Sequence, residues 1–262
     1  MMRSLLHRLL RGAPRSSTLA AGLEALDRGD TDKALAIAQA LCGADASRAG
    51  GQYLRGLVLE NRGAQPQAIA ALREACALAP QEGVFQLKLA QMLDAGGDAA
   101  AGAAAFEAAF GAADVPFAND ALVHFSAAGA HFRSGNAQQA IDHLRVAVGL
   151  KPDFVEAQVN LARLLQLDGS FEDAAGHMDR ALQFQPSAAL RLRRALMLPA
   201  VFRSRQHIAQ VRSELDRRLD ELLADAPYRL EDPAVTIATA PFLLAYHGED
   251  DRPLMTKLAQ VV

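Results

Sequence analysis

The fold is decided by the stretch HFRSGNAQQAIDHLRVAVGLKPDFVEAQVNLARLLQLDGSFEDA, residues 131–174, in which Gly135 and Gly169 occupy equivalent places. Each glycine follows a run of apolar residues at helical spacing, and an alanine comes five positions after each glycine, at Ala140 and Ala174. Glycine adopts the backbone conformation that a tight turn needs, and a small side chain lets two helices approach closely. The stretch therefore predicts helical hairpins that recur at the spacing of these two glycines.

The same markers recur on both sides of this stretch. The turn glycines are Gly29, Gly63, Gly97, Gly135 and Gly169; the intervals between them are equal, except that the one before Gly135 is four positions longer. Small residues follow five positions later, at Ala34, Ala68, Gly102, Ala140 and Ala174. Prolines come seventeen positions after three of the glycines, at Pro80, Pro152 and Pro186. We expect these prolines to end the second helix of a pair and to occupy the first turn of the next pair.

This spacing resembles the tetratricopeptide repeat family, whose unit is about 34 residues long. The resemblance implies an all-α fold, a right-handed superhelix of about five helix pairs over residues 15–187, followed by extra C-terminal helices in residues 188–262. Stacked pairs bury the apolar faces that a single pair leaves exposed, and five copies are enough for a stable stack. In each pair, the first helix is called helix A and the second helix B.

Two segments depart from the regular pattern. Residues 99–113 contain ten alanines, but Phe106 and Phe110 lie four positions apart and so share one helical face, which predicts a packed helix B. The long interval before Gly135 contains GAADVPFAND, residues 111–120. Because insertions in repeat proteins fall in loops, we expect a bulging connection there.

Composition and termini set wider bounds. The 262 residues are 51% hydrophobic and 22% charged, with no apolar run long enough to span a membrane. Residues 1–14 carry arginines and no acidic residue, which predicts a basic N-terminal helix or tail. Cys42 and Cys76 share one repeat position, so we interpret them as core residues that are too far apart for a disulfide. The low cysteine count and the lack of an expected disulfide favour a cytoplasmic location.

Some histidines have a spacing that metal ligands or packed rings could share. His124 and His131 lie seven positions apart on one helix, with Asp120 one turn earlier, a spacing that is compatible with metal ligation. They also occupy repeat positions that call for large packed rings, and no further ligand lies at helical spacing, so packing is the preferred interpretation. His143 and His177 share a helix B position and are expected on the solvated surface. The sequence predicts no metal site, and it has no glycine-rich phosphate loop, so no cofactor is expected.

The helix A faces are the predicted binding surface. A groove along them would suit a protein partner or an extended peptide, which amides can hold by its backbone and aromatic rings can anchor. The side chains expected to be exposed there are Tyr53, Leu57, Leu87, Gln91, Phe125, Phe132, Arg133, Asn160, Arg163 and Gln166, of which about half are expected to pack between repeats instead.

Residues 188–230 contain nine arginines and five acidic residues, in contrast to residues 24–187, with 12 basic and 20 acidic residues. We interpret the arginines at 191, 193, 194, 203 and 205 as partners of a neighbouring acidic surface rather than as a nucleic-acid site. The final segment, TKLAQVV, leaves Leu258, Val261 and Val262 without an evident partner in the sequence. An exposed apolar end of this kind would favour association between copies of the chain.

Two phrases after the repeats, LPAVFRSRQHIAQVR and PFLLAYHGEDDRPL, resemble the region that follows the repeats in bacterial SPINDLY-type O-linked N-acetylglucosamine transferases of glycosyltransferase family 41. The residues that match are Pro199, Phe202, Ser204, Ile208 and Arg212, and then Phe242, Leu244, Ala245, Tyr246, His247, Gly248, Asp251 and Arg252. The resemblance implies that Phe242, Tyr246, His247, Asp251 and Arg252 belong to an interdomain linker.

It further implies two Rossmann-like lobes that transfer a sugar from a nucleotide sugar to a serine or threonine hydroxyl, with the repeats recruiting the acceptor protein. Residues 188–262 are too few for two such lobes, so we expect no catalytic residue in this chain and an inactive piece of such an enzyme. A nucleotide sugar would bind only to a further C-terminal domain. The alternative is a free-standing tetratricopeptide adaptor that scaffolds protein–protein interactions.

Overall fold

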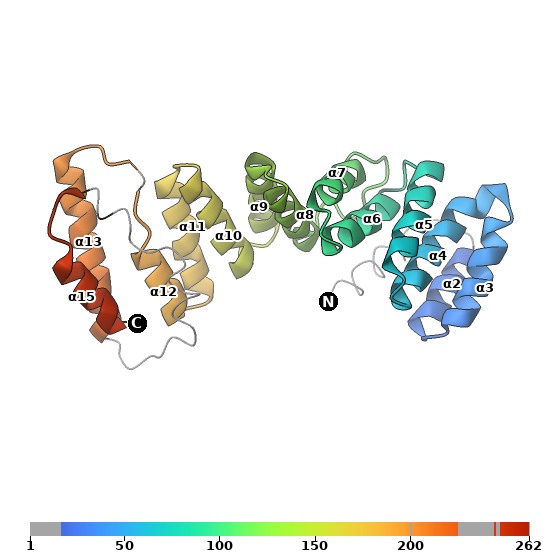
Figure 1. Ribbon diagram of the computed structural model, residues 1–262, viewed down its shortest axis with the longest axis horizontal. Helices are drawn as coiled ribbons and strands as arrows, with labels where there is room; N and C mark the ends of the chain where they lie inside the picture. The colour runs from blue at the N-terminus through green and yellow to red at the C-terminus, as the bar shows by residue number, and fades with distance from the viewer. Residues whose placement is uncertain (1–16, 200, 225–243, 245–246, 262) are drawn as a thin grey trace. The chain divides into compact units, whose positions relative to one another are not determined.

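The computed structural model describes residues 17–199, 201–224, 244 and 247–261 (Figure 1). Every extended regular element in these residues is helical. The pairs are α2 (Ser17–Asp27) with α3 (Thr31–Cys42), α4 (Arg48–Asn61) with α5 (Gln65–Leu78), α6 (Gly83–Ala95) with α7 (Ala99–Phe110), α8 (Ala121–Arg133) with α9 (Ala137–Leu150), and α10 (Val155–Leu167) with α11 (Phe171–Phe184). After them come α12 (Ala188–Ala195), α13 (Arg205–Ala224) and α15 (Arg252–Val261), and a short 3-10 helix, η1 (Asp45–Ser47), precedes α4. The predicted all-α fold of helix pairs with extra C-terminal helices is confirmed. The predicted N-terminal basic segment, residues 1–14, lies outside the described residues.

The turn within each pair is made by the predicted glycine. The five φ angles lie between 76° and 88°, in the left-handed region that disfavours other residues. After each glycine, the next amide donates to a carbonyl five residues back, as Asn136 N does to His131 O at 2.8 Å. This hydrogen bond is typical of a Schellman helix end and satisfies a carbonyl that the helix leaves unpaired. No atom lies within 4 Å of the place where a Cβ would stand, so glycine is required here by backbone conformation and not by space.

Close approach of paired helices explains the small residues on helix B. Ala34, Ala68, Ala140 and Ala174 are fully buried. A Cβ on Gly102 would lie only 3.1 Å from the backbone nitrogen of Asp94 on the partner helix α6. The prediction that these positions set the spacing of each pair is confirmed.

The alanine-rich segment forms helix α7, as its two phenylalanines predicted. Phe106 is fully buried in the core. The connection from α7 to α8 is a loop, as expected, but it does more than bulge outward. Its Phe117 is fully buried and packs edge to face on Phe110, with ring centroids 5.6 Å apart. The insertion therefore adds an aromatic residue to the core.

The predicted position of the prolines is wrong in one respect. Helix α5 ends at Leu78 and α6 begins at Gly83, so Pro80 lies in the connection and not in the first turn of the next helix. Pro152 likewise lies between α9 and α10. These prolines still end helix B, because proline disfavours the helical conformation in the residue before it.

The chain divides into two compact units, Met1–His143 and Leu144–Val262, with the boundary inside α9. In the first unit, the main apolar core runs through successive helix pairs, and a smaller cluster joins Ala25, Ala34 and Val58. In the second unit, the apolar face of α13 packs against α12 and α15 through Leu192, Leu215, Leu219, Leu254 and Leu258.

This packing corrects the expectation for the C-terminal apolar residues. Leu258 and Val261 are 6% and 8% exposed, because α13 supplies the partner surface. They therefore offer no exposed patch for association between copies, and Val262 lies outside the described residues. Within those residues, no helix is long and apolar enough to cross a membrane.

Candidate binding surfaces and side-chain clusters

The first predicted binding residues, on helices α4 and α6, are buried. Tyr53 and Leu87 are fully buried, and Leu57 and Gln91 are each 9% exposed. Tyr53 stacks on Phe85, with centroids 4.4 Å apart and the rings 17° from parallel. These four side chains therefore belong to the part of the predicted set that packs between repeats, because helix A residues of neighbouring pairs pack on one another here.

Helix α8 differs from α4 and α6, because its predicted binding residues are at least partly exposed. Phe125 is half-buried, Phe132 is 37% exposed and Arg133 is exposed. Arg133 Nη2 lies 2.6 Å from each carboxylate oxygen of Asp94, which fixes the guanidinium over α6. On this helix, therefore, an aromatic ring and a cation remain at the surface of the first unit.

Helix α10, in the second unit, carries the remaining predicted residues. Arg163 is exposed, and Asn160 and Gln166 are half-buried. Gln166 Nε2 donates to the carbonyl oxygen of Leu198 at 3.3 Å. These three polar side chains lie outside the apolar packing of the second unit.

A cluster of histidines in the first unit is held by three helices. His124 and His131, on α8, are 7% and 3% exposed, and His124 stacks on Phe110 at 4.5 Å, as the packing interpretation of these rings predicted. His143, on α9, joins them, because its Nδ1 lies 2.9 Å from His124 Nδ1. Glu107 Oε1, on α7, lies 2.8 Å from His131 Nε2 and 3.0 Å from His143 Nε2.

The environment of this cluster shifts two pKa values. Burial lowers the pKa of His124 below its ordinary value, so its ring tends to stay neutral. Partial burial acts to raise the pKa of Glu107, but the interactions with His143 and His131 outweigh it and lower that pKa. The Glu107 carboxylate is therefore held in its charged form.

The prediction that His143 and His177 are solvated surface residues is wrong. Both are half-buried. His177 Nδ1 lies 2.7 Å from Oε1 of Gln158, a residue that is 1% exposed. Sequence spacing missed Glu107 as well, because it comes from a different helix pair and has no periodic relation to the histidines.

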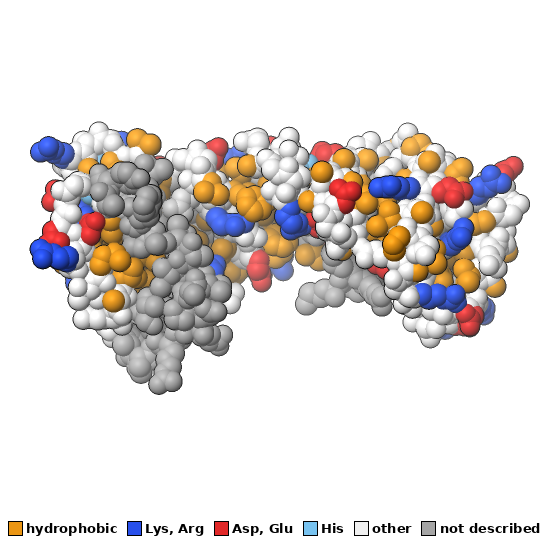
Figure 2. All heavy atoms as spheres, in the orientation of Figure 1, with side chains coloured by type: hydrophobic (Ala, Val, Ile, Leu, Met, Phe, Trp, Pro, Cys, Tyr) orange, Lys and Arg blue, Asp and Glu red, His pale blue; other side chains and the backbone are white. Residues whose placement is uncertain are grey.

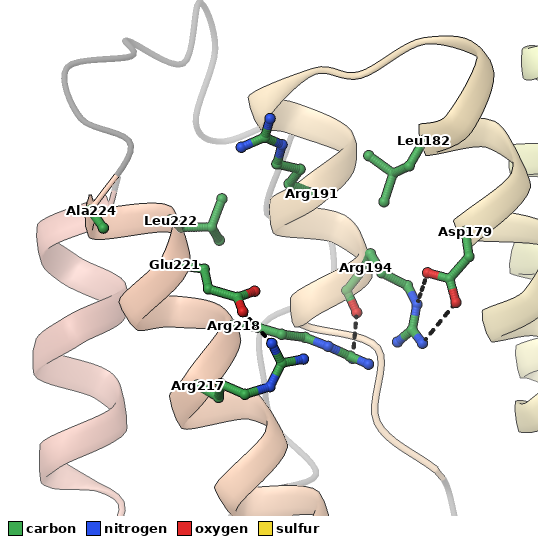
Figure 3. Close-up of a pocket in the computed structure, with 9 residues that line it drawn as sticks. All are labelled: Asp179, Leu182, Arg191, Arg194, Arg217, Arg218, Glu221, Leu222 and Ala224. Carbon is green, nitrogen blue, oxygen red and sulfur yellow. Dashed lines mark hydrogen bonds and ion pairs between the residues drawn. The ribbon is translucent and has the colours of Figure 1, made fainter.

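In the second unit, arginines of α12 and α13 line a cavity of about 480 Å³ beside α11 (Figure 3). The charged lining residues are Asp179, Arg191, Arg194, Arg217, Arg218 and Glu221. Arg194 Nε donates to Asp179 at 2.7 Å, and Arg203, outside the cavity, pairs with Glu172 at 2.7 Å. The predicted pairing of this arginine cluster with acidic neighbours is confirmed for these two residues.

The cavity keeps an excess of positive charge. Arg217 pairs with Glu214 and Glu221, and Arg218 pairs with Glu214. Burial, followed by the charge of Arg194, lowers the pKa of Arg218. Nη1 of Arg194 is buried and makes no hydrogen bond with the described residues, so the cavity contains a donor that an anionic oxygen would satisfy.

Several of the predicted linker residues meet near the start of α15. Arg212, on α13, donates to Asp251 at 2.5 Å and to the carbonyl oxygen of Asp250 at 2.6 Å, and Arg252 pairs with Asp250 at 2.7 Å. The ring of His247 meets Phe202 edge to face at 4.3 Å. Phe242 and Tyr246 lie outside the described residues. This arrangement is an ion-paired and aromatic junction. Among the residues that the structure describes, His247 has no hydrogen-bond partner that would suit it for proton transfer.

His247 gives a testable pH dependence. Burial, followed by the positive charge of Arg212, lowers its pKa below 6.5, while Asp251 and Glu249 act in the opposite direction. As the pH falls below about 6.5, the unfolded chain binds a proton that the folded chain resists, so stability decreases. We expect the His247→Phe variant to be at least as stable as the wild type at pH 7.5, because both ring nitrogens are buried and neither has a hydrogen-bond partner in the described part of the chain. Its melting temperature should also fall less between pH 7.5 and pH 5.5, and an equal fall in both proteins would contradict this interpretation.

Helix pairs joined by left-handed glycine turns, with small residues at their contacts, define a protein of helical-hairpin repeats. The sequence model of the tetratricopeptide repeat matches residues 19–83 and 87–153, and a second model of the same description matches residues 131–196. The chain belongs to the tetratricopeptide repeat family, whose fold is a protein-binding scaffold.

Solved structures with the same fold include YrrB, described as a tetratricopeptide protein with an unusual peptide-binding site. It is 18% identical, with a TM-score of 0.56, over 67% of this chain and 88% of YrrB. MamA from Desulfovibrio magneticus RS-1 is also 18% identical, with a TM-score of 0.52, over 66% of this chain and all of that chain. No curated protein matches the sequence. At these identities the likeness concerns the fold alone.

Proposed function

We propose that this chain is a protein-binding adaptor that holds extended peptide segments on helix A surfaces, that of α8 in the first unit and that of α10 in the second. One observation carries the proposal: the groove residues predicted on these two helices lie at or near the surface, whereas those predicted on α4 and α6 are buried. The side chains concerned are Phe125, Phe132, Arg133, Asn160, Arg163 and Gln166. An aromatic ring can anchor a partner side chain, and amides can pair with its backbone.

The arginine-lined cavity supports a preference for acidic partners. A carboxylate from the partner would accept a hydrogen bond from Nη1 of Arg194 and would balance the excess positive charge of the cavity. On the face shown in Figure 2, cationic and anionic side chains are interspersed, without the broad block of one sign that is typical of nucleic-acid binding. We therefore infer that the partner is a protein segment with acidic residues.

Peptide display tests this proposal. Panning a random peptide library on the full chain is expected to enrich acidic sequences, and the Kd of an enriched peptide can be measured by fluorescence anisotropy. Phe132→Ala should weaken the binding of peptides that bind to α8 about tenfold or more, and Arg163→Glu should do the same for peptides that bind to α10. The reason is that contacts at an interface anchor commonly contribute over 1 kcal/mol. The matched controls are Phe184→Ala and Arg73→Glu, which alter exposed helix B residues of the same types. Equal losses in controls and test variants would contradict the assignment of these surfaces, and no enrichment at all would contradict peptide binding.

A second candidate is the acceptor-recruiting region of a SPINDLY-type protein O-glycosyltransferase. The observation that favours it is the junction near α15, where Phe202, Arg212, His247 and Asp251, all residues of the two resembling phrases, come together. The sugar-transferring lobes would then follow this chain. The gene sequence beyond the codon for Val262 is the test: continuation into alternating strands and glycine-rich turns would support it, and an immediate stop codon would contradict it without affecting the adaptor proposal.

A further inference from the structure

We propose that Glu107, His131 and His143 form a binding site for a divalent transition-metal ion, and for Zn²⁺ in particular. They come from three successive helices, α7, α8 and α9, and each directs a ligand atom to one point. These atoms, one from each residue, all lie within 4.8 Å of one another. Two imidazoles and one carboxylate are a ligand set that zinc sites use, with a fourth position left for water or another ligand.

The hydrogen bonds behind the site fix which nitrogen of His143 carries its proton. His124 Nε2 lies 3.0 Å from the carbonyl oxygen of Ala118, and a carbonyl can only accept, so Nε2 of His124 must carry the proton. In the neutral ring, His124 Nδ1 is then an acceptor. It must accept its hydrogen bond from Nδ1 of His143, 2.9 Å away.

This chain of hydrogen bonds leaves Nε2 of neutral His143 with a lone pair, which is directed at a carboxylate oxygen of Glu107 only 3.0 Å away. Two acceptors at that distance repel each other unless a proton or a metal ion lies between them. A histidine that binds a metal ion through one nitrogen usually donates a hydrogen bond from its other nitrogen to a neighbouring group, which orients the ring. The pair of His124 and Ala118 supplies such an orienting group.

The other ligands allow a metal ion to enter. His131 is nearly fully buried, and no hydrogen bond to its Nδ1 fixes the proton on either ring nitrogen, so Nε2 can present a lone pair. Zinc bonds of about 2.0–2.1 Å place tetrahedral ligands roughly 3.3 Å apart, slightly more than the 2.8 and 3.0 Å found here. The Glu107 carboxylate has to withdraw by a few tenths of an ångström, which its 54% exposed side chain allows. The two histidine nitrogens, which lie within 4.8 Å of each other, have to reach the same separation of roughly 3.3 Å.

Titration of the untagged, chelator-treated full chain with ZnCl₂ in a calorimeter tests the site. We expect one equivalent of Zn²⁺ to bind with a Kd below about 1 µM and to raise the melting temperature, since the metal binds only the folded arrangement of the three helices. Glu107→Gln and His143→Asn should each weaken binding by 100-fold or more. The matched control is His177→Asn, at the same repeat position in the next helix B. His177 faces Gln158 and belongs to no group of three such ligands within the described residues. This variant should leave the affinity unchanged.

A further variant separates metal binding from general packing. His124→Phe keeps a ring to stack on Phe110 but removes the acceptor that orients His143, so the Zn²⁺ affinity should fall by about 10- to 100-fold. Circular dichroism identifies variants that fold, and Glu107→Gln, with its exposed side chain, is expected to be among them. Wild-type protein that binds no Zn²⁺ would overturn the proposal and indicate a proton between His143 and Glu107 instead. Zinc binding that persists unchanged in Glu107→Gln and His143→Asn would overturn the assignment of these ligands.

Discussion

Replacement of Glu60 with alanine is expected to lower the free energy of unfolding by about 3 kcal/mol. Lys88 Nζ lies 2.7 Å from Glu60 Oε1, and the lysine side chain is only 7% exposed. Without the carboxylate, a positive charge would remain in the core of the first unit with neither water nor a counter-ion. Loss of one partner of a buried ion pair typically costs about 3–5 kcal/mol, and the low end applies because Glu60 is itself 33% exposed.

The companion variant Lys88→Met provides the control. It removes the charge instead of its partner and places an apolar side chain of similar length among the buried residues of α6, so stability should change little or increase. Urea unfolding followed by circular dichroism measures both variants. If Lys88→Met cost as much as Glu60→Ala, the lysine would act by shape rather than by charge, contrary to this prediction.

Replacement of Phe106 with alanine is expected to cost about 3–5 kcal/mol, because it removes a fully buried ring and leaves a cavity in α7. The helix has few other large side chains to fill the gap, since alanines surround Phe106. The effect is therefore expected toward the upper end of that range.

Phe184→Ala makes the same chemical change at a residue that is 47% exposed on α11, and its cost should stay within about 0.5–1 kcal/mol. Both can be measured by urea unfolding at one temperature. Similar costs for the two variants would mean that α7 does not pack as described.

The fold could be predicted from the sequence because its determinants are local. A left-handed glycine turn such as Gly135, and a small helix B residue such as Ala140, act within a single helix pair and recur with it. The packing of the C-terminal helices was harder to predict. Leu258 packs against α13, and this contact follows no repeat in the sequence.

The candidate sites depended on contacts between pairs, which periodicity does not specify. Tyr53 was expected in a groove and is buried against Phe85, one pair further along the chain. The sequence did not predict Glu107 as a site residue, although its carboxylate contacts two histidines of the next pair. The repeat position predicts which residues face the adjacent helix pair. The side chains of that pair then decide whether these residues form a core, an exposed surface or a set of metal ligands.

The helix contacts also bear on how the chain reaches this structure. Within the first unit, helices pack against their neighbours in chain order, as α4 does on α5 and α6 does on α7. Each hairpin can therefore form soon after its own residues leave the ribosome, without waiting for distant segments. Synthesis and assembly can proceed together, so that nascent apolar faces are covered one hairpin at a time.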